Sequence, residues 1–122
     1  MKNRFALFAL IAALSAVSVS AATITDAMAS LDKAYIPVLA LTSQGKAEAA
    51  GKAMTILKVE WPAWVRDNAG AYADAGWSQA IAAVGRAIAE SDSQIAKSDL
   101  AGAHETLEQV RNILMKQRDA CA

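Results

Sequence analysis

Few residues in this chain could do chemistry, and the first is its single histidine. Glu108 follows His104 by four positions, and Glu105 stands directly after it. Residues four apart on a helix lie one above the other, so an imidazole and a carboxylate at this spacing can hold a metal ion together. Two ligands do not complete a site, and the alternative is an ordinary helix histidine beside Ala103. His104 and Glu108 are therefore the candidate metal ligands.

Methionine sulfur is the second source of chemistry. Met28, Met54 and Met115 carry soft thioethers, which suit Cu(I) or haem iron. Together with His104 and Cys121 they form a candidate set for soft-metal (copper) handling. The alternative for each methionine is core packing, its commoner role at helical spacing.

The aromatic and thiol groups allow two further interpretations. Trp61, Trp64 and Trp77 cluster near the middle of the chain. They predict either a hydrophobic plug at one end of a core, or an aromatic wall beside a planar ligand or a partner protein. Cys121 is an odd cysteine next to the last residue. It predicts either a mobile, unpaired thiol or a homodimer joined by an intermolecular disulfide.

Catalytic motifs are not found in the sequence. The chain has no Gly-x-Ser-x-Gly, no His-Glu-x-x-His, no phosphate-cradling glycine loop and no paired-carboxylate motif, which predicts that it is not an enzyme. One cysteine excludes a disulfide framework and any multi-cysteine zinc or iron–sulfur site. Without its first 22 residues the chain has ten basic and twelve acidic residues, a net charge of −2. That balance predicts no nucleic-acid partner.

The N-terminal segment is typical of a secretory signal peptide. Lys2 and Arg4 precede an apolar stretch at Phe5–Leu14, and small residues follow. The apolar run is shorter than a membrane span needs, so we expect cleavage rather than anchoring. The sequence thus predicts a signal peptide at 1–22, a single domain at 23–122 with no membrane span, and a periplasmic location.

The rest of the chain has the composition and periodicity of helices. Residues 23–122 contain 23 alanines and two prolines, which favours helix over strand. Apolar residues recur at steps of three and four in four stretches, namely 24–42, 46–67, 77–97 and 100–117. Short connections imply antiparallel neighbours, so we expect an all-α, antiparallel up-down-up-down four-helix bundle. Pro62 leaves a three-helix domain with a bent second helix as the alternative.

Two short segments resemble the small soluble periplasmic cytochrome b family. Thr25-Asp26-Ala27-Met28-Ala29-Ser30-Leu31 resembles the family's opening helix, and Arg111-Asn112-Ile113-Leu114-Met115-Lys116-Gln117 resembles its last helix. In that family a methionine near the start of the first helix and a histidine near the end of the last hold a haem. The resemblance implies a four-helix bundle with Met28 as one haem ligand. Met115 stands where the family has its histidine, and His104 lies ~16 Å upstream along the helix.

Three functions follow as expectations. The most specific is a non-catalytic, cytochrome b-like protein that binds haem through Met28 and Met115 and transfers electrons. The first alternative is a cofactor-free adaptor whose apolar groove binds another envelope protein or a small apolar ligand. The second alternative is copper handling.

Overall fold

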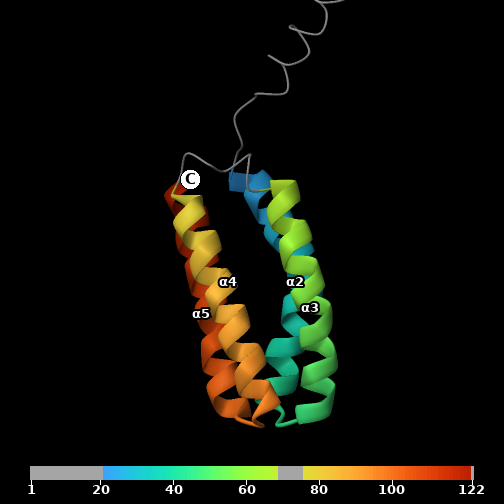
Figure 1. Cartoon of the computed structure of the whole chain (residues 1–122). Coiled ribbons are helices and arrows are strands. Elements are labelled where there is room, and N and C mark those ends of the chain that lie inside the picture. Colours follow the sequence, from blue (N-terminus) through green and yellow to red (C-terminus); the bar gives the residue numbers. More distant parts are fainter. Residues whose placement is uncertain (1–20, 69–75, 122) are drawn as a thin grey trace, which may run out of the picture.

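The computed structural model describes residues 21–68 and 76–121, over which the chain forms four helices (Figure 1). Their bounds are α2 Ala21–Ser43, α3 Ala47–Asn68, α4 Trp77–Ala96 and α5 Leu100–Cys121. Helix α2 packs against α3 and α5, and α4 packs against the same two helices. The predicted all-α up-down bundle is confirmed, and the three-helix alternative is wrong because α2, α3, α4 and α5 are separate.

The sequence also predicts a signal peptide and the absence of a membrane span. The predicted signal peptide at 1–22 falls almost wholly outside the described residues. Among the helices that the structure describes, none has a stretch long and apolar enough to cross a membrane.

The core is made from the apolar stripes of the four helices. Burying one aliphatic or aromatic side chain contributes about 1.5–3 kcal/mol, so these stripes supply the main stabilising free energy. Small alanines at Ala50, Ala53, Ala80 and Ala87 are also buried and let the helices approach closely. The large buried side chains are Leu31, Tyr35, Val38, Met54, Leu57, Trp61, Trp64, Trp77, Val84, Ile88, Ile95, Leu107, Val110 and Leu114.

A tight turn joins α2 to α3 at the end of the bundle drawn lowest in Figure 1. Gly45 has a φ of 72°, in the left-handed region where a glycine carries no Cβ penalty. The Lys46 amide donates to the Leu41 carbonyl at 3.0 Å, and the Gly45 amide donates to the Thr42 carbonyl at 3.2 Å. This pair of bonds is a Schellman motif, which satisfies carbonyls that the helix end would otherwise leave unpaired.

The turn from α4 to α5 at the same end repeats this pattern with a serine. Ser98 has a φ of 60°, the Ser98 amide donates to the Ile95 carbonyl at 2.9 Å, and the Asp99 amide donates to the Gln94 carbonyl at 2.8 Å. Asp99 then caps α5, because its carboxylate accepts a hydrogen bond from the Gly102 amide at 3.0 Å. The chain therefore holds a non-glycine residue in left-handed geometry at Ser98.

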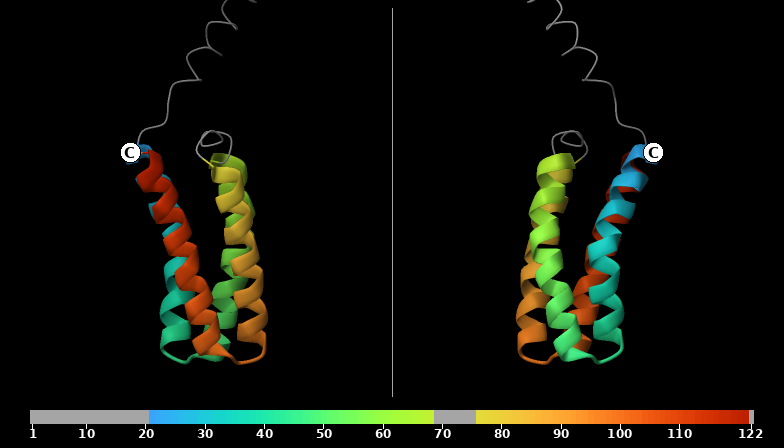
Figure 2. Two further views of the ribbon diagram at one scale, coloured as in Figure 1. Left: turned by 90° about the vertical axis from the view of Figure 1, so that its left-hand side faces the viewer. Right: turned by 90° about the vertical axis from the view of Figure 1, so that its right-hand side faces the viewer.

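Tryptophans fill the opposite end of the bundle, where the α2–α5 pair and the α3–α4 pair lie further apart than at the turns (Figure 2). Trp61 and Trp64 stack with centroids 5.5 Å apart and planes 12° from parallel, and both are buried. The Trp64 indole N–H donates to the Ala27 carbonyl at 2.7 Å, which joins α3 to the start of α2. Trp77 is 0% exposed. Burial of all three side chains supports the predicted hydrophobic plug.

Both prolines lie inside helices that continue past them. Pro37 lies in α2 and Pro62 in α3, and both are exposed. A proline removes one backbone donor and leaves the carbonyl four residues earlier without its helical partner. Because Lys33 and Lys58, which supply those carbonyls, are also exposed, water can satisfy them.

Replacing Ser98 with glycine is expected to stabilise the protein by about 1 kcal/mol, because glycine removes the Cβ strain of the left-handed conformation. The matched substitution Gly45→Ser is expected to destabilise it by a similar amount at the equivalent turn position. Urea unfolding followed by circular dichroism measures both. Equal midpoints for Ser98→Gly and the unmodified protein would contradict the assignment of strain to Ser98.

Candidate functional site

A groove runs between α2 and α5, the first and last described helices. Its volume is about 260 Å³. The floor is apolar and buried, and is formed by Leu31, Tyr35, Val110 and Leu114. Residues of the walls and rim are Thr25, Met28, Ala29, Asp32, Arg111, Met115 and Arg118.

The groove brings together the two methionines that the sequence singled out. Met28 comes from α2 and is half-buried, whereas Met115 comes from α5 and is 38% exposed. Met54 is 0% exposed in the core on α3, so it is a packing residue and is not part of the groove. The side chain of Cys121 lies outside what the structure describes, so the predicted disulfide dimer stays a prediction.

Two guanidinium groups and one carboxylate line the groove. Arg111 and Arg118 both line it, against the single carboxylate of Asp32. Arg118 also bonds the neighbouring Asp119 carboxylate, with Nη2 at 3.1 Å and Nε at 3.3 Å. That exposed pair is weak, so the Arg118 guanidinium remains able to turn toward an anion in the groove.

The groove can be tested directly for its fit to haem. Two thioethers are suitable iron ligands, and two guanidinium groups would suit propionates, so the donor types fit. The volume of the groove, however, is too small for a porphyrin. Pockets that bury a drug-sized molecule measure about 300–1,000 Å³, and a porphyrin is larger than most drugs. Because the floor is packed core, a porphyrin would have to separate α2 from α5, and haem ligation by Met28 and Met115 stays a prediction.

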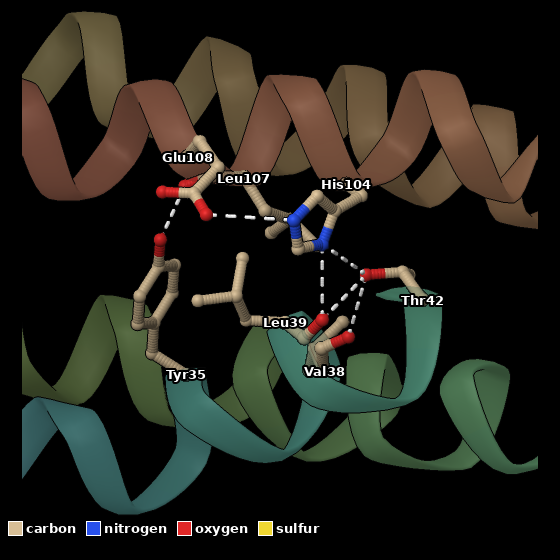
Figure 3. A network of polar contacts seen from close by, with 7 residues as sticks. All are labelled: Tyr35, Val38, Leu39, Thr42, His104, Leu107 and Glu108. Atoms are coloured by element: carbon tan, nitrogen blue, oxygen red, sulfur yellow. Dashed lines mark hydrogen bonds and ion pairs between the residues drawn. The ribbon is translucent and has the colours of Figure 1, made fainter. Parts of the chain in front are cut away.

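His104 lies closer to the turns, in a polar network between α5 and α2 (Figure 3). Its Nδ1 lies 3.1 Å from the Leu39 carbonyl oxygen and 3.3 Å from Thr42 Oγ1. Thr42 Oγ1 is itself 2.9 Å from the carbonyl oxygens of Val38 and Leu39, to which its hydroxyl can donate. A carbonyl oxygen only accepts, so Nδ1 must carry a proton and donate it.

The other ring nitrogen faces the predicted partner. His104 Nε2 lies 3.4 Å from Glu108 Oε1, and the two side chains are 30% and 47% exposed. The i,i+4 spacing has therefore brought the two predicted metal ligands together. Among the described residues, no group of three or more His, Cys, Asp or Glu side chains is placed to hold a metal. Figure 3 shows both side chains projecting from α5 toward α2.

Tyr35 lies between the groove and this network and belongs to both. Its ring lines the groove floor, and its hydroxyl donates to the Leu107 carbonyl of α5. Burial raises the pKa of Tyr35 to about 12, with a further increase from the Glu108 carboxylate, while the Arg111 guanidinium acts in the opposite direction. The phenol is therefore held neutral as a hydrogen-bond donor.

Three charged residues of the groove are not among the site residues predicted from the sequence. Asp32, Arg111 and Arg118 lie next to the apolar stripes, and the two arginines are seven residues apart on one helix face. The seven-residue spacing of the two arginines is the feature of the sequence that indicates a shared basic surface on this helix. Tyr35 and Thr42 fall within the apolar-periodic stretch 24–42, and both are buried.

Comparisons with protein-family models, with curated proteins and with solved structures returned no match. The four-helix architecture implied by the cytochrome b resemblance is present, and no family is identified.

The raised pKa of Tyr35 gives a prediction for high pH. The folded-state pKa of about 12 exceeds the ordinary 10.0, so the stability linked to the neutral phenol is complete below pH 10 and is lost as pH rises toward 12. The loss is at most about 1.4 kcal/mol per pH unit. Absorbance titration of the tyrosinates should show one late phenol, absent from Tyr35→Phe. A single titration near 10 for both tyrosines of the chain would contradict this.

Proposed function

We propose that this protein is a non-catalytic binding protein whose groove between α2 and α5 takes a small amphipathic anion, such as a medium-chain carboxylate. The observation that supports it is the composition of the groove, which combines an apolar floor with two arginines at its rim. The expected signal peptide extends the proposal to a periplasmic role.

The shape of the groove suits an alkyl chain. Met28 and Met115 offer flexible, polarisable side chains that can repack around an aliphatic ligand. A volume of about 260 Å³ is below the usual range for drug-sized ligands, so the proposed ligand is smaller than a drug or a cofactor.

Charge supports an anionic head group. Arg111 and Arg118 outnumber Asp32 in the groove, and a guanidinium binds a carboxylate through two parallel hydrogen bonds. The groove therefore favours carboxylates and sulfonates over metal cations, which is why copper handling is not part of this proposal.

The proposal predicts that decanoate binds the purified protein at one molecule per chain in a calorimetric titration. Replacing Arg111 and Arg118 together with glutamine is expected to weaken decanoate binding by about tenfold or more, since a hydrogen bond to a charged group contributes about 1.5–3 kcal/mol. Met115→Glu, at an exposed rim position, is expected to weaken it as well.

The matched control is Val59→Glu, which removes an apolar side chain that is 67% exposed on α3, away from the groove. It is expected to leave decanoate binding unchanged. Decanoate binding that is insensitive to the arginine substitutions would contradict the proposal. A haem titration that gives a Soret band lost in Met28→Ala would replace it with the haem-binding prediction.

A further inference from the structure

The environment of His104 carries an inference separate from the groove: we propose that His104 Nε2 and Glu108 Oε1 supply two ligands of a weak Zn²⁺ site, completed by water, on the outer side of the α2–α5 interface. Three features support this site, namely the proton on Nδ1, the distance between Nε2 and the carboxylate, and the access of solvent to both side chains.

The proton on His104 Nδ1 fixes the chemistry of the other nitrogen. Nδ1 lies 3.1 Å from the Leu39 carbonyl oxygen and therefore carries the donated proton. In the neutral ring, Nε2 then has its lone pair exposed. A ligating histidine that donates its other N–H to a backbone carbonyl is the usual outer-shell arrangement of protein metal sites, because it fixes the tautomer and the ring orientation.

The neutral ring leaves two acceptors facing each other. Glu108 Oε1 lies 3.4 Å from His104 Nε2, and an ionised carboxylate has no hydrogen to donate to a lone pair. A cation placed between these atoms satisfies both. When the ring is an imidazolium, the proton on Nε2 is that cation. When the ring is neutral, a metal ion can take its place and bind both atoms.

The distance between Nε2 and Oε1 can be compared with the distance between two ligands of a zinc ion. Zinc binds imidazole nitrogen at about 2.0–2.1 Å and carboxylate oxygen at about 2.0–2.2 Å, so two ligands at the tetrahedral angle lie about 3.4 Å apart. A right angle between the same ligands would give about 2.9 Å. The Nε2 to Oε1 distance of 3.4 Å matches the tetrahedral separation.

Solvent can supply the remaining ligands. The side chains of His104 and Glu108 are 30% and 47% exposed, so two positions of a tetrahedral ion are open to water. Two protein ligands, with no third in the described residues, make a site weaker than a structural zinc site with four protein ligands. Thr42 also approaches Nδ1 and helps to hold the ring against α2.

The test is calorimetric titration of ZnCl₂ into the purified protein carrying Cys121→Ser, so that the thiol does not bind zinc. We expect one ion per chain. Losing an outer-shell partner of a metal site costs about 10–100-fold in affinity, so loss of a ligand in His104→Asn or Glu108→Gln is expected to cost at least about tenfold. Glu105→Gln, which removes an equal charge from the adjacent exposed position, is the matched control and should leave the affinity unchanged.

A second measurement does not depend on the stability of the variants. The chain has one histidine, so nitrogen NMR shows a single imidazole. Zinc is expected to shift Nε2 while Nδ1 keeps its proton. No binding up to millimolar zinc, zinc binding that survives both ligand substitutions, or an Nε2 resonance that zinc leaves unmoved would each overturn the proposal.

Discussion

The packing of the first helix against the last is the constraint on which the rest of this structure depends. Helices α2 and α3 are joined by a short turn, as are α4 and α5, but nothing covalent joins α2 directly to α5. Their interface is closed by buried apolar side chains and by polar links that include those from Tyr35 to the Leu107 carbonyl and from His104 to the Leu39 carbonyl. Each of these two links uses a side-chain donor and a backbone acceptor, so it fixes the level of one helix against the other.

This one interface holds two chemically different surfaces. The apolar groove with arginines at its rim lies toward the tryptophan end, and the network of His104 lies closer to the turns. Tyr35 separates them, because its ring forms part of the groove floor while its hydroxyl reaches α5. An anion on one side and a cation on the other are therefore compatible with the same helix pair.

Much of the architecture could be predicted from periodicity. The stripe of Leu107, Val110 and Leu114 is buried as its spacing indicates, and the i,i+4 spacing brings Glu108 to His104. The donors and acceptors across the interface could not be predicted in this way. The rotation of each helix about its axis decides which face meets its neighbour, and a backbone acceptor such as the Leu39 carbonyl leaves no mark in the side-chain pattern.

The position of the tryptophans makes the two ends of the bundle differ in intrinsic fluorescence. All three indoles of the chain are buried at the end away from the turns. Intrinsic fluorescence therefore senses the loosening of that end alone, and fraying at the Gly45 and Ser98 turns would leave the emission unchanged. Comparing fluorescence with backbone dichroism during denaturation consequently shows whether the bundle melts as one cooperative unit or from one end first.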